Sequence, residues 1–214
     1  MSKFKAVIFD LDGTLLNTIQ DITDAINYAC KKNGLNETTV DLVRYATGNG
    51  KLVLIDKTIK THPDHPLYTQ ELYDNMLKDY LYVYSLWKSN HTKPYEGVVR
   101  TLNILKKRGI IIAVLSNKPD NDSKDIIRKY FPNTFDIVQG QIEGVPPKPN
   151  KEMTDLVINK LYNDYHISKD EIMYVGDSDV DVKTYQNAGL FGVGACYGFR
   201  SKKELEEVDR KSVV

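Results

Sequence analysis

The stretch that decides the fold of this chain runs Ala6-Val-Ile-Phe-Asp-Leu-Asp-Gly-Thr14. Its first four residues are apolar and lie between charged residues, a pattern that predicts a short buried strand. The strand ends at two aspartates, Asp10 and Asp12, and Gly13 after them permits a sharp turn. Because every second side chain of a strand faces the same way, both carboxylates can face one crevice at the strand end.

The chain from residue 92 onward alternates between two kinds of pattern. Short apolar runs predict strands, and longer segments with apolar residues at helical spacing predict helices. The strands are expected over 110–115, 135–138, 172–175 and 191–195, and the helices over 96–108, 120–130, 151–162 and 179–188. Strands that alternate with helices in this way form right-handed βαβ units around a parallel sheet. We therefore expect an α/β fold with a Rossmann-like parallel sheet.

Residues 17–91 lack a strand of the buried, branched-aliphatic kind. Helical patterns are found instead, over 18–33, 51–60 and 69–88. The prolines of the segment 61–66 predict a loop that is exposed to solvent. The sequence thus predicts a helical domain of residues 17–91, inserted after the first strand of an α/β core formed by residues 1–16 and 92–214.

The composition narrows the classes of function. The 214 residues include 29 lysines and arginines and 29 aspartates and glutamates, so the formal net charge is zero. Without an excess of positive charge, sequence-independent binding to nucleic acid is disfavoured. No segment approaches the roughly 20 apolar residues that span a membrane, and two cysteines far apart are typical of a reducing compartment. We expect a cytoplasmic protein, monomeric or homodimeric, without a nucleic-acid or membrane partner.

Polar residues stand at the ends of three predicted strands. Asp10 and Asp12 follow the first strand, Ser116 and Asn117 the second, and Asp177 the fourth. In a parallel sheet the carboxyl ends of the strands meet along one edge, where functional groups gather. Aspartate is common at strand ends and in turns, which accounts for any one of these residues alone. Their coincidence on three strands favours a functional site.

Carboxylates that converge from separate strands repel one another, which is costly unless a cation joins them. The candidates are Asp10, Asp12 and Asp177, with Asp181 a few residues beyond. Hard oxygen ligands of this kind favour Mg²⁺, which binds through one or two carboxylates together with substrate phosphate. The sequence therefore predicts a magnesium site at this edge of the sheet.

Two further side chains would complete a site for a phosphoryl group. Lys148 lies in a proline-rich loop before a predicted helix, and Ser116 follows a predicted strand. A fixed ammonium and a hydroxyl beside the carboxylates would neutralise and bind phosphoryl oxygens.

These residues resemble the four motifs of the haloacid dehalogenase superfamily. Asp10-Leu-Asp-Gly-Thr14 is similar to the first motif, DxDGT, and Ser116 to the second, a serine or threonine after an apolar strand. Lys148-Pro149 is similar to the third, and Gly176-Asp-Ser-Asp-Val-Asp181 to the fourth, GDSxxD. The helical insert resembles the C1 cap of the superfamily. Thr14-Leu-Leu-Asn-Thr18 resembles its phosphoglycolate phosphatase-like branch.

The resemblance implies phosphoryl transfer through an aspartate. Asp10 would be the nucleophile that forms an aspartyl-phosphate. Asp12 would be the general acid that protonates the leaving alkoxide and then the base that activates water. The resemblance also implies that Mg²⁺ binds to Asp10, to the backbone carbonyl of Asp12 and to Asp177, while Asp181 orients this metal site from behind.

The same resemblance implies that Ser116, Asn117 and Lys148 bind the phosphoryl group. The physics agrees, because a carboxylate becomes a usable nucleophile on phosphorus once Mg²⁺ and Lys148 cancel the repulsion between negative charges.

The segment Ala46-Thr-Gly-Asn-Gly-Lys51 resembles the substrate-specificity loop of the cap. Glycine amides at the start of a helix can receive an anion. Arg44, Gly48 and Lys51 are therefore candidates to contact an acidic group at the far end of the substrate. A plain turn between two helices accounts for the same pattern equally well.

Together these features predict a Mg²⁺-dependent phosphatase for a small phosphomonoester, with phosphoglycolate as one candidate substrate. A sugar phosphomutase shares the motifs and the cap, although Gly176-Asp-Ser fits the phosphatase pattern better than the Glu-Asp pair expected of a mutase. Pyrophosphatase or nucleotidase activity remains open. A non-catalytic sensor of phosphorylated ligands is disfavoured because Asp10 and Asp12 are both present.

Overall fold

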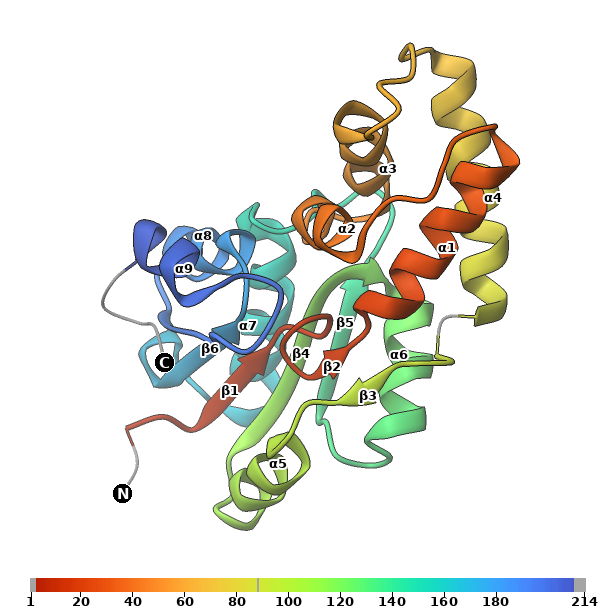
Figure 1. The fold of residues 1–214 in the computed structure, drawn as a ribbon. Coiled ribbons are helices and arrows are strands. Elements are labelled where there is room, and N and C mark those ends of the chain that lie inside the picture. Colours follow the sequence, from red (N-terminus) through yellow and green to blue (C-terminus); the bar gives the residue numbers. More distant parts are fainter. Residues whose placement is uncertain (1–2, 88, 210–214) are drawn as a thin grey trace. The chain divides into compact units, whose positions relative to one another are not determined.

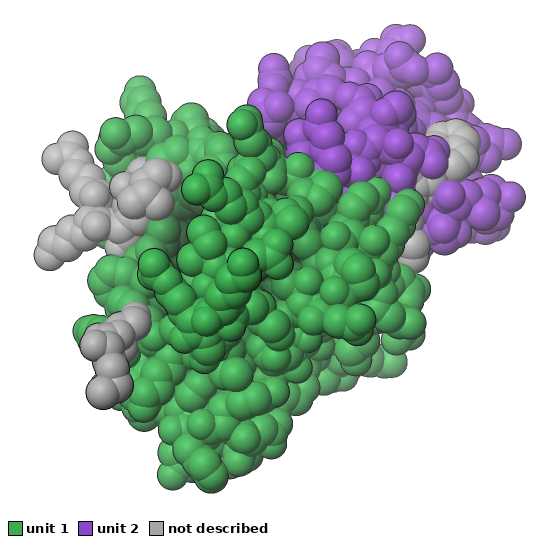
Figure 2. Space-filling model, turned by 90° about the horizontal axis from the view of Figure 1, so that it is seen from below, with its two compact units in different colours: residues 1–16, 94–214 green, residues 17–93 purple. Residues whose placement is uncertain are grey.

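The computed structural model describes residues 3–87 and 89–209 of the chain. It divides into two compact units, one formed by residues 1–16 and 94–214 and the other by residues 17–93 (Figure 2). The first unit is built on a sheet and the second on helices.

A five-stranded parallel sheet forms the first unit, and its strands lie in the order β5-β4-β1-β6-β7 (Figure 1). The strands are β1 (Ala6–Phe9), β4 (Ile111–Pro119), β5 (Ile137–Gln141), β6 (Ile172–Gly176) and β7 (Phe191–Gly194). The α/β class and the parallel sheet predicted from the sequence are confirmed. The strand order reverses at β1, which pairs with β4 on one side and β6 on the other. Such a reversal opens a crevice at the carboxyl ends of the strands.

Two strands differ from their predicted bounds by more than one residue. β4 extends to Pro119 instead of ending at residue 115, so that Ser116 and Asn117 lie within the strand and not after it. β5 begins at Ile137 and continues to Gln141, later than the pattern predicts. Both strands extend beyond the apolar residues that predict them, because β4 and β5 pair again at Pro119 and Gln141 after a shift in register.

Helices cover both faces of this sheet. They are α5 (Val98–Lys107), α6 (Asp120–Tyr130), α7 (Lys151–Tyr165), α8 (Asp179–Ala188) and α9 (Lys202–Val208), with a short 3-10 helix at Lys169–Glu171. Ala6 and Ile8 of β1 join the core with α7 and α8, whereas Val7 and Phe9 join the core with α5 and α6. Burial on both faces explains why β1 is an unbroken apolar run.

Among the described residues, four helices form the second unit: α1 (Ile19–Lys32), α2 (Val40–Ala46), α3 (Lys51–Thr61) and α4 (Gln70–Trp87). α4 packs mainly against α1. The predicted helix over 69–88 corresponds to α4, and residue 88 lies outside the described residues. The sequence pattern does not predict α2, a short helix that begins where the Thr39 hydroxyl accepts a hydrogen bond from the Leu42 N–H. No helix in the described part of the chain is both long and apolar enough to cross a membrane.

The loop predicted to be exposed over 61–66 is buried at one residue. His62 is 1% exposed. Its ring lies 3.1 Å from the Asn36 carbonyl oxygen through Nε2 and accepts a hydrogen bond from the Asp64 N–H at Nδ1. The prolines of the loop indicate the turn correctly but do not show that the histidine side chain satisfies two backbone groups inside the unit.

The segments that enter and leave the second unit are tied together. β2 (Leu16–Asn17) pairs with β3 (Lys93–Pro94) in a two-stranded sheet. Asp21, in the first turn of α1, is 1% exposed. Its carboxylate accepts hydrogen bonds from the backbone N–H groups of residues 90–92 and from the Thr92 hydroxyl. This carboxylate therefore fixes the end of the second unit to its first helix.

Replacing Asp21 by alanine should lower the free energy of unfolding of the second unit by about 2–4 kcal/mol, because four donors lose a buried charged acceptor. Equilibrium unfolding in urea, followed by circular dichroism, measures the loss. Asp24→Ala is the matched control in the same helix, because Asp24 is half-buried and contacts the Gln20 side chain at 2.7 Å and the His91 ring at 3.5 Å, but accepts none of the backbone hydrogen bonds that Asp21 accepts. The control should change the free energy of unfolding by less than about 1 kcal/mol. Equal losses in the two variants would contradict the role given to Asp21.

Candidate active site

The carboxyl edge of the sheet brings three carboxylates together. Asp10 follows β1, Asp177 follows β6, and Asp181 lies in the first turn of α8. All three side chains are buried, and their ligand oxygens lie within 4.8 Å of one another. Burial, followed by the negative charge of Asp181, raises the pKa of Asp10 well above its usual range. Ionising Asp10 therefore requires positive charge nearby.

Lys148 supplies positive charge in the middle of this cluster. Its Nζ is 2.8 Å from Asp10 Oδ1, 2.8 Å from Asp181 Oδ1 and 3.0 Å from the Tyr174 hydroxyl, and its side chain is 2% exposed. An ammonium group has three N–H donors, so each donor has an acceptor here. Burial by itself would lower the pKa of Lys148, but the charges of Asp10 and Asp181 raise it well above its usual value. Lys148 is thus a fixed positive charge.

Asp181 is held in its ionised form. The Tyr174 hydroxyl donates to Oδ1 at 2.8 Å, and the backbone N–H and hydroxyl of Ser178 donate to Oδ2 at 3.1 and 2.6 Å. Burial opposes ionisation, but the charge of Lys148 and these hydrogen bonds lower the pKa of Asp181 below its usual value. With two donors on each oxygen, Asp181 anchors both Lys148 and the start of α8.

Sequence reasoning missed Tyr174. In the sequence it is one member of the predicted strand over 172–175, and its side chain is indeed fully buried in the core. Burial and the neighbouring Asp181 raise the pKa of its hydroxyl well above the usual value, so it remains a hydrogen-bond donor. The signal that could have identified it is a hydroxyl within a strand that ends at Gly176-Asp177.

Asp177 is enclosed by two loops. Its Oδ1 accepts a hydrogen bond from the Thr14 hydroxyl at 2.7 Å, and its Oδ2 accepts one from the Phe199 N–H at 2.6 Å. Both loops pass so close that only glycine fits: a Cβ on Gly13 would lie 2.2 Å from Asp177 Oδ2, and one on Gly198 would lie 2.3 Å from Asp177 Cβ. Burial, followed by repulsion from Asp181, raises the pKa of Asp177 to about 7.

This donor set fits a hard divalent metal ion. Asp10 and Asp177 offer carboxylate oxygens, the ligands that such ions prefer. Burial, followed by the negative charge of Asp181, raises the pKa of both side chains, so added positive charge would favour their ionised forms. A bound cation would provide that charge. The three carboxylates are therefore a group that could hold a metal ion.

Asp12 is paired with Lys118, a residue outside the motifs that the sequence shows. Asp12 Oδ2 lies 3.2 Å from Lys118 Nζ, and the lysine side chain is 6% exposed. The other oxygen, Asp12 Oδ1, is buried and has no hydrogen-bond partner among the residues that the structure describes. The sequence pattern does not identify Lys118, because the strand that it predicts ends at residue 115. Once β4 continues to Pro119, Lys118 is the second residue after Ser116 on the same strand.

Ser116 and Asn117 are buried in β4. The Ser116 hydroxyl accepts a hydrogen bond from the Lys118 N–H at 3.1 Å. The Asn117 side chain spans the backbone of Lys148: Nδ2 donates to the Lys148 carbonyl at 3.0 Å, and Oδ1 accepts from the Lys148 N–H at 2.8 Å. Asn117 thus joins β4 to the loop of Lys148, a role that the sequence does not predict.

The three remaining predicted residues, Arg44, Gly48 and Lys51, lie in the second unit. Arg44 is in α2, where its guanidinium pairs with Asp41 at 2.8 Å, and Lys51 begins α3. Their contact with a substrate stays a prediction.

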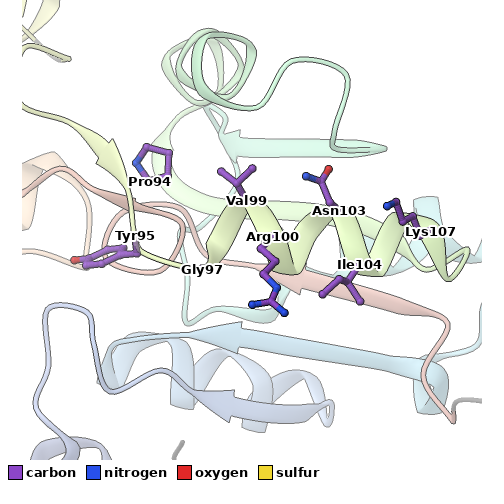
Figure 3. Close-up of a pocket in the computed structure, with 8 residues that line it drawn as sticks. All are labelled: Pro94, Tyr95, Gly97, Val99, Arg100, Asn103, Ile104 and Lys107. Carbon is purple, nitrogen blue, oxygen red and sulfur yellow. The ribbon is translucent and has the colours of Figure 1, made fainter.

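A hollow elsewhere on the first unit is lined by eight residues of the segment 94–107 (Figure 3). Arg100 and Ile104 project from one side of α5 in this view, and Val99 and Asn103 project from the other. None of the predicted site residues lines this hollow.

Comparison with known proteins gives the family. A family model described as haloacid dehalogenase-like hydrolase matches residues 7–195. A phosphoglycolate phosphatase of Vibrio cholerae is 30% identical over 214 residues, which covers 98% of this chain and 92% of the relative. A phosphoglycolate phosphatase of Pseudomonas savastanoi is 28% identical over 98% of this chain and 76% of the relative.

Solved structures agree with this match. A protein from Lactobacillus delbrueckii subsp. bulgaricus, provisionally named a phosphoglycolate phosphatase, superposes with a TM-score of 0.89 at 28% identity, covering 100% of this chain and 95% of that one. A haloacid dehalogenase-like family hydrolase from Streptococcus pneumoniae has the same fold, with a TM-score of 0.85 at 16% identity, covering 100% of this chain and 94% of that one. Because the family model spans most of the chain and the full-length relatives are phosphatases, the chain belongs to the haloacid dehalogenase-like hydrolases and is a phosphatase of that family.

Proposed function

We propose that this phosphatase hydrolyses 2-phosphoglycolate, with Mg²⁺ as its metal ion and with Asp10 as the residue that becomes phosphorylated. The observation that carries the proposal is the pairing of Asp10 with a buried ammonium, since Lys148 Nζ lies 2.8 Å from Asp10 Oδ1. The choice of substrate is supported by the full-length relatives, which bear the name phosphoglycolate phosphatase.

The first step forms a bond between Asp10 and phosphorus. An oxygen of the Asp10 carboxylate attacks phosphorus, and the bond from phosphorus to the ester oxygen breaks. Asp12 gives its proton to the departing oxygen, so that an alcohol leaves. Lys148 offsets the negative charge of the phosphoryl oxygens, and the Ser116 hydroxyl donates a hydrogen bond to one of them.

The second step releases phosphate. A water molecule attacks the phosphorus carried by Asp10, and Asp12, now ionised, takes a proton from that water. The bond between phosphorus and Asp10 breaks, and the Asp10 carboxylate is restored. Asp12 regains the proton that it gave in the first step, so both residues end the cycle as they began it.

The metal site would use Asp10, Asp177 and the backbone carbonyl of Asp12. Bound Mg²⁺ supplies positive charge that reduces the repulsion between the carboxylates and the phosphoryl oxygens. Asp181 acts from behind these ligands by holding Lys148 in place, and Asn117 holds the backbone of the same lysine. These contacts hold the Lys148 ammonium at a fixed position beside the substrate.

The helical insert predicted at residues 17–91 would act as a cap that excludes bulk water and selects the leaving group. Arg44, Gly48 and Lys51 are candidates for contact with the acidic end of the substrate, although their loop serves equally well as a plain turn. We place the enzyme in the cytoplasm, as a monomer or homodimer, without a nucleic-acid or membrane partner.

Phosphate release from a panel of esters tests the reaction and its metal. The panel holds 2-phosphoglycolate, sugar phosphates, nucleotides and pyrophosphate, each assayed with Mg²⁺ and with EDTA. We expect 2-phosphoglycolate to have the highest kcat/KM and EDTA to lower the rate by at least about 100-fold, because charge neutralisation is lost. Folded protein that releases phosphate from no member would contradict the proposal. Transfer to a sugar hydroxyl that outpaces phosphate release would indicate a phosphomutase.

Asp10→Asn should lower kcat by at least about 1,000-fold, because an amide does not form the acyl-phosphate bond. Mass spectrometry after an acid quench should detect phosphate on Asp10 in the natural protein and none in the variant. Asp24→Asn, a change of the same kind in α1, is the control and should keep kcat within about twofold. Turnover by Asp10→Asn at the natural rate would remove Asp10 from the mechanism.

Asp177 should make the metal-free protein sensitive to pH. Its pKa of about 7 in the folded protein exceeds the value of about 3.9 for an unfolded aspartate. Folding therefore takes up a proton between these pH values, and the free energy of unfolding falls as the pH rises through them. Asp177→Asn removes this dependence. In EDTA it should raise the melting temperature by about 3 °C or more at pH 8 and by less at pH 5, while activity with Mg²⁺ is lost.

Differential scanning calorimetry at both pH values measures these shifts. Asp120→Asn is the control of opposite sign. Burial opposes ionisation of Asp120, but hydrogen bonds from Lys124 and the Gly140 N–H lower its pKa, so its removal should lower the melting temperature at pH 8. An equal gain for Asp177→Asn at pH 5 and pH 8 would show that ionisation of Asp177 is not the cause.

A further inference from the structure

Lys118 is a buried charge that the steps of the proposed mechanism do not use. Its side chain is 6% exposed, and its Nζ lies 3.2 Å from Asp12 Oδ2. Lysine is seldom buried unless it is paired with an anion. A buried cation beside the proposed proton donor would attract negative charge on the leaving group.

The backbone of Lys118 is fixed from two sides. Its N–H donates to the Ser116 hydroxyl at 3.1 Å, and its carbonyl accepts a hydrogen bond from the Ser123 hydroxyl at 3.2 Å. The first contact ties the lysine to a residue that faces the phosphoryl group in the proposed mechanism. These contacts fix the backbone of Lys118, and the ion pair with Asp12 places its ammonium 3.2 Å from Asp12 Oδ2.

In the proposed mechanism, the ammonium of Lys118 lies on the leaving-group side of phosphorus. Asp12 has to reach the ester oxygen in order to protonate it, and Lys118 Nζ is one hydrogen-bond length from Asp12. The ammonium then lies within about 6 Å of the ester oxygen, the sum of two hydrogen-bond lengths. In 2-phosphoglycolate one methylene separates the ester oxygen from the carboxylate, so the carboxylate oxygens lie roughly 2.7–3.6 Å from that oxygen. The two groups are within reach of each other.

The charges of the site favour this contact. The three N–H donors of Lys148 are directed to Asp10, Asp181 and Tyr174. Lys148 also shows that one ammonium in this site pairs with two carboxylates at the same time. Lys118 can pair in the same manner with Asp12 and with a carboxylate of the substrate.

We propose that Lys118 binds the carboxylate of the leaving group and selects phosphate esters that carry a carboxylate one carbon from the ester oxygen. This inference rests on the proposed function, because it takes Asp12 as the proton donor. It assigns the selection of a small anionic substrate to a residue of the sheet, in addition to the candidates Arg44, Gly48 and Lys51 that the sequence predicts.

A pair of substrates that differ in one charge tests the proposal. In 2-phosphoglycolamide a neutral amide of similar size replaces the carboxylate of 2-phosphoglycolate. The natural enzyme should prefer the carboxylate by at least about tenfold in kcat/KM. Lys118→Met should lower kcat/KM for 2-phosphoglycolate at least about tenfold more than for the amide, since a charge-assisted contact is lost only with the former. Lys118→Arg keeps a positive charge and should retain most of the preference.

Binding without turnover gives a second readout. Titration of 2-phosphoglycolate into Asp10→Asn, followed by calorimetry, should show a Kd that rises about tenfold when Lys118→Met is added. Melting temperatures report whether each variant folds, and Lys118→Gln replaces Lys118→Met if the latter does not.

Four outcomes would overturn the inference, and they are distinguishable. Equal losses of kcat/KM for both substrates in Lys118→Met would show that the lysine only positions Asp12. Loss of the preference in Lys51→Met but not in Lys118→Met would place the carboxylate contact in the second unit. A natural enzyme that hydrolyses both substrates equally well would contradict carboxylate recognition while leaving the phosphatase intact. Folded natural enzyme that hydrolyses neither would contradict the proposed function itself.

Discussion

The buried ammonium of Lys148 is the contact on which the rest of the site depends. Asp10 and Asp181 each lie 2.8 Å from its Nζ, and this positive charge offsets the repulsion between two buried carboxylates. The lysine does not affect them equally. The pKa of Asp181 falls below its usual value, whereas burial keeps that of Asp10 well above its own. Asp181 receives further hydrogen bonds from Tyr174 and Ser178, so it is a permanent anchor, while the ionisation of Asp10 depends on which cation lies beside it.

Local sequence leaves this cluster little freedom. Ser178 and Asp181 form a reciprocal capping box at the start of α8, so the hydrogen bonds that begin the helix also orient the carboxylate that holds Lys148. Close approach fixes the neighbouring Asp177 in a similar way, because a side chain at Gly13 or Gly198 would collide with it. The same few residues thus serve as helix cap, loop closure and support for a charge. For this reason their motif is visible in the sequence as a short, dense pattern.

That density explains which parts could be predicted. Asp10 and Asp177 follow apolar runs with plain boundaries, and both lie where the strand order reverses, so the carboxyl ends of β1 and β6 could be located from the pattern alone. Lys118 could not be located, because its place depends on β4 continuing past its apolar residues to pair again with β5. The role of Asp21 could not be predicted for the same reason. An aspartate in a first helical turn is ordinary, and this one is buried by a segment that lies 70 residues away, at His91. Sequence patterns indicate where a helix or strand begins. The role of a polar side chain in it depends on the residues from distant segments that contact this side chain.

Asp10 and Asp12 are two residues apart, yet each meets a different lysine. Lys148 reaches Asp10 from the loop before α7, and Lys118 reaches Asp12 from β4. In the proposed mechanism the two aspartates act on opposite sides of one phosphorus, the first on the bond that forms and the second on the bond that breaks. One shared lysine would make any change on the leaving-group side alter the nucleophile as well. Because the positive charges come from separate elements, the substrate preference can change at Lys118 while Asp10, Lys148 and Asp181 keep the arrangement that phosphoryl transfer requires.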